Sequence, residues 1–419
     1  MFNILVNAYA CNPYWGSEQG IGWHWSIELA KYCKVIVITE GEFKENIEKA
    51  LADLPQKENL TFIYNNVSDK VRKMCWNQGD WRFYYYYRRW QKKTLEIAQE
   101  ICEKEKIDVI HQLNMQGFRE PGLLWKIKGP KYVWGPVGGM GLMPMAYLKG
   151  ESLKKRFFFG LKNIINRMQR RYQPNVHQAI KRADVLLAST PDEQRVFKEA
   201  YHKESHFIND TGCDISIEGI ENKKGTEQRF TGETLELLWV AKFDFRKQLG
   251  LAVRVMGELK DLNVRLNIAG GGANAEDYKK LAEELGVADK CVFHGVIPHE
   301  KVLAIMQSAD IFFFTSIKEE SSTVILEAIG AALPIVCFDT CGFGPIVDDN
   351  IGRKVRITNP QQSIKDFAEV IRNIYYHREL LPEMSKQCAA KQEELSWNYK
   401  ARFVVDLYER LLNQKNVSC

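Results

Sequence analysis

The 419-residue chain lacks several features that would define its class at once. No apolar run approaches the roughly 18 to 20 residues needed to span a bilayer. The first residues, MFNILVNAYA, have no basic stretch, so we expect a buried strand there and no signal peptide. The ten cysteines are scattered and form no Cys-x-x-Cys pair; Cys337 and Cys341 come closest. We therefore expect reduced thiols in a cytoplasmic protein, without a disulfide framework or a structural zinc site.

The composition is that of a globular enzyme, with 45% apolar and 26% charged residues, and the length suggests two to three domains. The formal net charge is +5, but it is uneven along the chain. Residues 1–215 carry 32 basic against 24 acidic residues (+8), whereas residues 216–419 carry 26 against 29 (−3). This asymmetry predicts two domains with different partners.

Short apolar runs rich in β-branched residues alternate with stretches of helical periodicity. The alternation predicts parallel sheets covered on both faces, and two series of five or six strands predict two doubly wound α/β domains. We expect the first series at Phe2–Asn7, Val35–Thr39, Thr61–Tyr64, Asp108–His111, Tyr132–Trp134 and Asp184–Ala188. We expect the second at Leu235–Ala241, Val264–Ala269, Cys291–Gly295, Ile311–Thr315 and Pro334–Asp339.

A polar run without periodic apolar residues, Ser216–Thr234, separates the two series. It predicts an N-terminal domain at 1–215 and a C-terminal domain at 216–398. The chain then ends in a predicted amphipathic helix, roughly Tyr399–Asn413, in which Phe403, Leu407 and Leu411 share one face.

The stretch Glu319–Pro334, EESSTVILEAIGAALP, follows a predicted strand and carries the clearest chemical signal. A helix that begins near Ser322 or Thr323 directs free N–H groups and its positive dipole end to the edge of the sheet, which suits a phosphate or diphosphate. Glu327, one turn further on, can accept two hydrogen bonds from a vicinal diol such as a ribose. The alternative is an acidic residue before a helix and a surface glutamate.

Two lysines follow the first strand of the second series, where Leu237–Ala241 runs into KFDFRKQLGL. Lys242 and Lys247 would neutralise a diphosphate leaving group as its charge develops, although two solvated loop lysines would give the same pattern. A glycine turn, Gly270–Gly272, follows the next strand. No Asp-x-Asp metal motif occurs, so we expect no metal, and lysine cations in its place.

The second half of the chain carries a series of motifs, which in chain order are LLWVAKF, RKQ, LNIAGGG, VFHGVI, ADIFFFTS, the Glu319 and Glu327 pair, LPIV and Gly342. Together they resemble the donor-binding domain of retaining glycosyltransferases of family 4. Motifs in the first half of the chain agree with the same family: GSEQGIGWHWSIELA, DVIH, GPVGG and ADVLLAST. The resemblance therefore covers nearly the whole chain. It implies a GT-B fold, with two Rossmann-like domains facing a deep cleft and a C-terminal helix, 399–419, that crosses back to the first domain.

The resemblance also implies roles for individual residues. Glu319 is the first glutamate of the family's E-x7-E motif, near the reacting carbon of the donor sugar, and Glu327 is the second, on the nucleotide ribose. Lys247 matches the lysine of the diphosphate clamp. Lys242 stands where the family commonly has arginine, which loses the bidentate guanidinium. In place of the frequent Gly-Phe-Gly, this chain offers the hydroxyls of Ser322 and Thr323 and the backbone amides of Thr323 and Val324; Gly271 lies in the glycine turn.

The first half adds weaker candidates. After the first strand, three glycines would let the backbone approach the donor diphosphate, unless they only form a tight turn: Gly16, Gly20 and Gly22. Four further residues are possible acceptor or sugar contacts: Glu18, Trp23, Gly138 and Gly139. His111 ends a predicted strand, where parallel sheets gather functional residues. In the family a histidine of this region lies near the donor sugar or the acceptor hydroxyl, and a structural role is the alternative.

The segment Leu153–Arg171, LKKRFFFGLKNIINRMQRR, carries seven basic residues and no acidic one. Such a helix suits an anionic membrane surface, which predicts a cytoplasmic protein that is peripheral on the inner face of the membrane. Trp81–Lys93 also mixes aromatic and basic residues, and there we expect an aromatic helix packed on the sheet. Nucleic acid is not an expected partner.

The function that the resemblance implies is a metal-independent, retaining hexosyltransferase without a cofactor. It would move a sugar from a UDP- or GDP-sugar to a glycan or lipid-linked acceptor in bacterial envelope or capsule polysaccharide synthesis. Two alternatives stay open. One is another GT-B enzyme, a nucleotide-sugar epimerase or a phosphorylase, and the other is a non-catalytic nucleotide-sugar-binding subunit.

Overall fold

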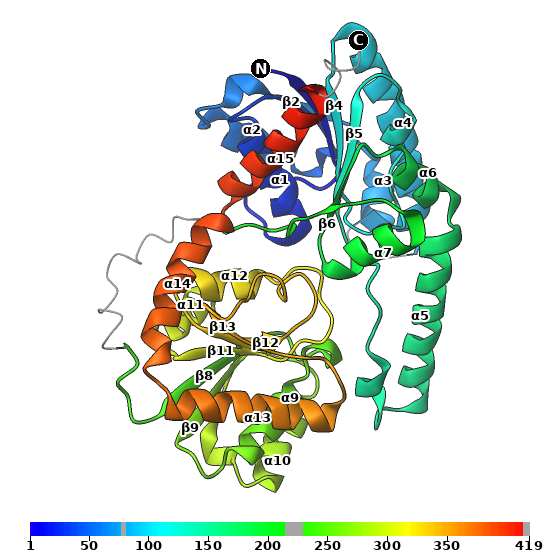
Figure 1. Cartoon of the computed structure of the whole chain (residues 1–419). Coiled ribbons are helices and arrows are strands. Elements are labelled where there is room, and N and C mark those ends of the chain that lie inside the picture. Colours follow the sequence, from blue (N-terminus) through cyan, green and yellow to red (C-terminus); the bar gives the residue numbers. More distant parts are fainter. Residues whose placement is uncertain (77–80, 214–228, 414–419) are drawn as a thin grey trace. The chain divides into compact units, whose positions relative to one another are not determined.

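The computed structural model describes residues 1–76, 81–213 and 229–413 (Figure 1). The chain divides into two compact units: unit 1 comprises Met1–Met140, Ile164–Thr211 and Trp397–Cys419, and unit 2 comprises Gly141–Asn163 and Gly212–Ser396. The predicted boundary near residue 216 lies outside the described residues. Residues 141–163 group with unit 2, whereas the sequence predicted them in the N-terminal domain.

Unit 1 contains a seven-stranded parallel sheet of order β3-β2-β1-β4-β5-β6-β7. The interior strand β1 alternates between the two faces, with Ile4 and Val6 in one hydrophobic cluster and Leu5 in another. Both faces are therefore covered, as parallel sheets require. The strands are β1 (Asn3–Ala8), β2 (Lys34–Thr39), β3 (Leu60–Tyr64), β4 (Val109–Asn114), β5 (Lys131–Val137), β6 (Val185–Ala188) and β7 (His206–Phe207).

Two groups of helices cover this sheet. The face of Ile4 packs against α1 (Ser17–Leu29) and α15 (Trp397–Asn413). The face of Leu5 packs against α4 (Phe83–Lys104), α6 (Pro174–Arg182) and α7 (Pro191–Tyr201). The remaining helices of this part of the chain are α2 (Lys44–Ala52), α3 (Asp69–Val71) and α5 (Leu153–Tyr172), and the division between the units runs through α5.

The amphipathic helix predicted near the C-terminus is confirmed as α15. Figure 1 shows it beside the N-terminal helix α1. Leu407 is buried and Phe403 and Leu411 are partly buried in the cluster shared with α1. The apolar face that the spacing predicts is therefore the face that packs on the sheet.

Unit 2 contains a six-stranded parallel sheet of order β10-β9-β8-β11-β12-β13. Helices flank both faces in Figure 1, with α9, α10 and α13 on one side and α11, α12 and α14 on the other. The strands are β8 (Leu235–Val240), β9 (Val264–Ala269), β10 (Cys291–Gly295), β11 (Ile311–Phe314), β12 (Ile335–Phe338) and β13 (Gly352–Val355). The helices are α9 (Leu249–Glu258), α10 (Ala275–Glu284), α11 (His299–Ser308), α12 (Thr323–Gly330), α13 (Pro360–Tyr376) and α14 (Leu380–Glu394).

Both units are thus Rossmann-like α/β domains, as predicted, and each strand predicted from the sequence is present. The two edge strands β7 and β13 were not predicted, because a two-residue strand and the sequence GRKV carry no apolar run. Within the described ranges, no helix is both long and apolar enough to cross a membrane.

The strand order reverses once in each sheet, between β1 and β4 in unit 1 and between β8 and β11 in unit 2. At such a point the loops that follow the two strands diverge, and ligands of doubly wound folds bind beside them. The loops after β8 and β11 hold the residues for which the sequence predicts chemistry.

Candidate functional site

The candidate site of unit 2 lies on two loops at the carboxyl edge of its sheet. Strands β8 and β11 are hydrogen-bonded neighbours, and both end at this edge. Residues 241–248 follow β8 and include Lys242 and Lys247, while residues 315–322 follow β11 and include Glu319. Sequence positions more than seventy residues apart therefore meet at the topological switch point.

Lys247 and Glu319 form an ion pair in which Nζ lies 2.5 Å from Oε1. Their side chains are 17% and 13% exposed, so water screens the pair only partly. Ser316 Oγ donates a hydrogen bond to the same Glu319 oxygen at 2.5 Å. Two donors thus hold the carboxylate in one place.

A hydrogen-bond chain from the sheet holds the loop of Lys247. The indole Nε1 of Trp239 donates to Thr315 Oγ1 at 2.9 Å, and this hydroxyl donates to the carbonyl of Lys247 at 2.8 Å. Trp239 and Thr315 are fully buried. Gln248 has a left-handed backbone, with φ of +53°, which turns the chain from this loop into α9. The lysine is therefore presented by a rigid backbone and not by a solvated loop.

The backbone of Glu319 is held by a cysteine that the sequence did not single out. Its N–H donates to Cys341 Sγ at 3.0 Å, and the N–H of Gly342 donates to the Glu320 carbonyl at 2.8 Å. Cys341 is buried, and burial raises the pKa of its thiol to about 12, so the sulfur stays protonated at neutral pH. Its role here is to position Glu319.

Helix α12 begins directly after this loop. Ser322 precedes it with an extended backbone, and its side chain makes no capping hydrogen bond. The first N–H groups of a helix have no acceptor within the helix, so those of Thr323 and Val324 are suited to an anion. Ser321 Oγ and Glu320 Oε2 are buried without a hydrogen-bond partner at the same place. The helix start predicted near Ser322 is confirmed.

The loop after β8 contains a third cation, Arg246, which was not among the residues predicted from the sequence. Arg246 pairs with Asp244, with Nε 2.9 Å from Oδ1. The hydrogen bond to Asp244 raises the pKa of the Arg246 guanidinium, and the charge of Glu319 adds to the effect. The same hydrogen bond lowers the pKa of Asp244. Lys242 is exposed at the start of the loop.

Glu327 lies in α12 and is partly exposed. His299 Nε2, at the start of α11, is 3.2 Å from its Oε1. The sequence singled out the glutamate but not the histidine, because the two residues belong to different helices and no local pattern joins them. A ribose diol that binds Glu327 would meet His299 beside it.

The glycine turn after β9 is required by packing. A side-chain carbon on Gly270 would lie 1.9 Å from the Ala241 carbonyl oxygen, and one on Gly271 would lie 2.6 Å from Val296 Cγ2. Gly270 also has a φ of +142°, which L-residues rarely adopt. The backbone contact requires a glycine at position 270, whereas Gly271 meets only the side chain of Val296, which is 85% exposed and can move; a donor contact of Gly271 stays a prediction.

In unit 1 the glycines after β1 are of two kinds. An added carbon on Gly20 would lie 2.4 Å from the Trp15 carbonyl oxygen and one on Gly22 would lie 2.0 Å from that of Ala10, whereas Gly16 meets nothing within 4 Å. Gly20 and Gly22 thus let α1 approach the preceding loop closely. Of the three glycines, Gly16 has open space beside its backbone, and it directly precedes α1.

Glu18, in the first turn of α1, accepts a hydrogen bond from the Gln116 N–H at 2.9 Å. Burial raises the pKa of this carboxyl, although the hydrogen bond opposes the shift. Gln116 in turn accepts from the N–H of Gly138 at 2.9 Å, and Gly139 follows with a φ of +84°. Glu18, Gly138 and Gly139 are therefore brought together around one loop, as the sequence could not show.

Two further predicted site residues, His111 and Trp23, have buried side chains. His111 is 0% exposed, with Nε2 2.7 Å from the Gly135 carbonyl oxygen and Nδ1 2.5 Å from the Tyr408 hydroxyl. A carbonyl only accepts, so Nε2 carries the proton and Nδ1 accepts from Tyr408. Burial lowers the pKa of His111 to about 4. Trp23 is also buried and stacks on Phe62. Neither side chain is available to a substrate, and both have structural roles.

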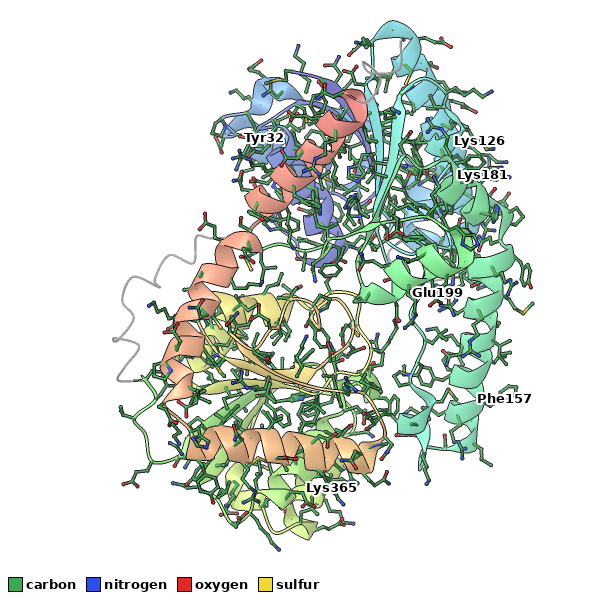
Figure 2. The ribbon with its side chains drawn as sticks, in the orientation of Figure 1. Tyr32, Lys126, Phe157, Lys181, Glu199 and Lys365 are labelled. Atoms are coloured by element: carbon green, nitrogen blue, oxygen red, sulfur yellow. The ribbon has the colours of Figure 1, made fainter. Side chains whose placement is uncertain are left out.

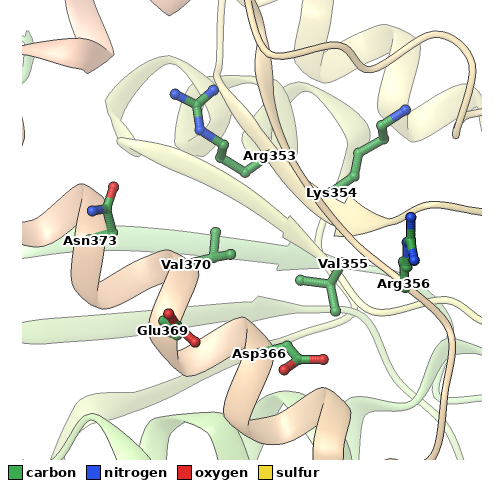
Figure 3. A pocket seen from close by; sticks show the side chains of 8 residues that line it. All are labelled: Arg353, Lys354, Val355, Arg356, Asp366, Glu369, Val370 and Asn373. Carbon is green, nitrogen blue, oxygen red and sulfur yellow. The ribbon is translucent and has the colours of Figure 1, made fainter.

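A separate hollow of about 430 Å³ lies between β13 and α13 (Figure 3). Two of its three lining cations already have partners: Arg353 donates to two backbone carbonyls, and Lys354 is 3.2 Å from Asp339. None of the predicted site residues lines it. Over the part of the chain that the structure describes, no group of three or more His, Cys, Asp or Glu residues is arranged to hold a metal ion.

Residues 221–392 match the family Glycosyl transferases group 1. This span is less than half of the chain, but it holds Lys242, Lys247, Glu319 and Glu327. D-inositol 3-phosphate glycosyltransferase from Corynebacterium jeikeium is 26% identical over 56% of this chain and 59% of that protein. The chain spans about half the length of the curated relatives it matches, 44% and 59% for two of them. These matches support the group 1 glycosyltransferase family.

Solved structures resemble the chain over nearly its whole length. A glycosyltransferase from Rickettsia africae covers 98% of this chain and 98% of its own length, with a TM-score of 0.61 at 16% identity. HepE from Anabaena, in complex with UDP, covers 98% of this chain and 100% of its own length, with a TM-score of 0.58 at 14% identity. At these identities the likeness shows the fold alone, which is that of GT-B proteins.

Proposed function

We propose that this chain is a retaining, metal-independent glycosyltransferase of family 4, which moves a hexose from a UDP- or GDP-sugar to a glycan or lipid-linked acceptor. The observation that carries the proposal is the Lys247–Glu319 ion pair at the carboxyl ends of β8 and β11. The start of α12 follows within four residues. A cation, a carboxylate and free N–H groups at one switch point suit a nucleotide diphosphate sugar.

Each element of the site has a role in the proposed reaction. Lys247 stabilises the departing diphosphate, together with the N–H groups of Thr323 and Val324. Lys242 adds a second cation, and Glu327 with His299 binds the ribose. Ser316 keeps Glu319 beside the reacting carbon of the sugar, because its hydrogen bond does not depend on Lys247.

The transfer itself exchanges one bond for another. The bond between the anomeric carbon and the diphosphate oxygen breaks, and a bond from the acceptor oxygen forms on the same face of the sugar. A phosphate oxygen of the departing nucleotide takes the acceptor proton. The reaction needs no cofactor, and the products are the glycosylated acceptor and the nucleoside diphosphate.

We assign the donor to unit 2 and the acceptor to unit 1, where Glu18, Gly138 and Gly139 are candidate acceptor contacts. The reaction would take place on the cytoplasmic face of a membrane, in envelope or capsule polysaccharide synthesis. The UDP complex of HepE supports uridine as the first nucleotide to test.

The test is a thermal-shift panel of UDP, GDP, ADP, CMP and their sugars. We expect one nucleoside diphosphate to raise the melting temperature, and Glu327→Ala to remove most of that shift because it deletes the ribose acceptor. Glu283→Ala, an exposed glutamate of α10, is the matched control and should keep the shift. If no nucleotide stabilises the wild type, or if Glu327→Ala leaves calorimetric affinity unchanged, the assignment of this site is wrong.

A further inference from the structure

Helix α5 exposes its apolar side chains to solvent and turns polar side chains toward the protein. Eight of its large apolar residues are exposed, and Figure 2 shows Phe157, 73% exposed, pointing away from the helix. The exposed set consists of Leu153, Phe157, Phe158, Leu161, Ile164, Ile165, Met168 and Tyr172. We call these eight residues the apolar stripe.

The inward face of α5 is made of amides and a guanidinium. Asn163 is buried, and its amide bonds both the N–H and the carbonyl of Met143 at 2.9 Å. Asn166 is buried and bonds Arg119 at 3.0 Å, and Arg170 donates to the Met140 carbonyl at 3.0 Å. These bonds fix which side of the helix faces the protein, because buried amides need their partners.

The helix geometry separates the two sets cleanly. At about 100° per residue, the apolar stripe falls within an arc of about 140°, and Asn163, Asn166 and Arg170 lie on the opposite side. Phe159, which directly follows Phe157 and Phe158 in the sequence, belongs to the inward side, with its ring 6.0 Å from that of Phe245. The stripe therefore runs along the full length of the helix, about 30 Å for its 20 residues.

The charges of α5 decide what kind of partner covers the stripe. Five exposed cations accompany it and no acidic residue occurs in the helix: Lys154, Arg156, Lys162, Arg167 and Arg171. A second copy of this chain on the same face would bring ten cations together, which is repulsive. An anionic lipid surface instead offers an apolar interior for the stripe and phosphates for the cations.

We propose that α5 lies flat in the interface of an anionic membrane, with the apolar stripe among the acyl chains and the cations at the headgroups. Long basic side chains reach the headgroup level from beside the stripe, and Lys154 does so from the first turn of the helix. The inference names the membrane partner of the proposed transferase, and it rests on that function only for the lipid-linked nature of the acceptor.

The test is co-sedimentation of the full chain with phosphatidylglycerol or phosphatidylcholine vesicles, without any nucleotide sugar. We expect tighter binding to phosphatidylglycerol, and a loss of at least about tenfold in affinity for the triple variant Phe157→Gln/Ile164→Gln/Met168→Gln. Arg156→Gln/Arg167→Gln should weaken binding and reduce its dependence on salt. Tyr376→Gln, an exposed aromatic of α13, is the matched control and should bind as the wild type does.

Two results would overturn the proposal. One is equal vesicle binding by the wild type and the triple variant. The other is a wild-type dimer in sedimentation equilibrium that the triple variant converts to a monomer, because a second copy would then cover the stripe. The side chains replaced in α5 and α13 are all exposed, so these variants should fold, which circular dichroism checks. Since the assay needs no turnover, Glu319→Ala should bind vesicles normally, and failure of the transferase proposal would leave this result unaffected.

Discussion

Replacing Lys247 by alanine tests the chemistry of the site most directly. The ammonium is 2.5 Å from Glu319 Oε1 and only 17% exposed, so its charge acts in a partly desolvated environment. If Lys247 contacts the donor diphosphate, its removal takes away stabilisation that grows as the leaving group gains charge. The expected effect is on kcat more than on KM.

The size of the effect follows from the geometry. A unit charge pair about 4 Å apart at an effective dielectric of about 20 is worth about 4 kcal/mol. Only the charge that develops during bond cleavage lowers the barrier, so we expect a loss of about 1.4 to 2.7 kcal/mol, or about ten- to a hundredfold in kcat. The fold should lose less than the about 3 to 5 kcal/mol of a fully buried pair, because Ser316 still holds the remaining carboxylate.

The assay is nucleoside diphosphate release from the donor identified by thermal shift, with the melting temperature measured in parallel. Lys247→Arg keeps the charge and should recover part of the rate. Lys280→Ala, an exposed lysine of α10, is the matched control and should behave as the wild type does. A Lys247→Ala enzyme with near wild-type kcat would refute the role of Lys247 at the leaving group.

Two further predictions concern stability. Gly22→Ala should lower the free energy of unfolding in urea by about 2 to 4 kcal/mol, because the new carbon would lie 2.0 Å from the Ala10 carbonyl oxygen. Gly16→Ala, with nothing within 4 Å of the new carbon, should lower it by less than about 1 kcal/mol. Equal losses for the two variants would contradict the packing argument. The pKa of His111 is about 4 in the folded chain and about 6.5 in the unfolded chain. Between these values the unfolded chain binds more protons, so the free energy of unfolding falls as the pH falls. From pH 7 to pH 5 the loss is about 2 kcal/mol. His111→Gln should lose this part of the acid sensitivity and the exposed His177→Gln should keep it, and identical pH profiles would contradict the assignment.

The sequence predicted the arrangement of the sheets well, because apolar runs of a parallel sheet are local and continuous. The strand Val264–Ala269 was predicted to the residue, and the edge strand Gly352–Val355 was missed because it is half polar. The positions of two candidate site residues were predicted for the same reason. Lys247 and Glu319 each follow an apolar strand, so both could be placed at one edge of the sheet before their ion pair was seen.

The supporting residues were not predictable from local patterns. Ser316, Cys341 and His299 contact the site through side chains whose partners lie on other segments, and only the fold brings them there. His111 illustrates a choice that the local pattern left open. The sequence allowed a site role or a structural role, and in the structure the hydroxyl of Tyr408, 297 positions further along the chain, occupies its second ring nitrogen.

The sequence by itself determined which residues share a strand, a helix face or a sheet edge, since these follow from periods of two and 3.6 residues. It could not determine which face meets the protein. Helix α5 has an apolar and a polar face in the sequence, and a sequence rule would bury the apolar one. The tertiary structure buries Asn163 and Asn166 instead, because the backbone groups of Met140 and Met143 need hydrogen-bond partners there. Burial is a property of the neighbours that a face meets, and those neighbours come from distant parts of the chain.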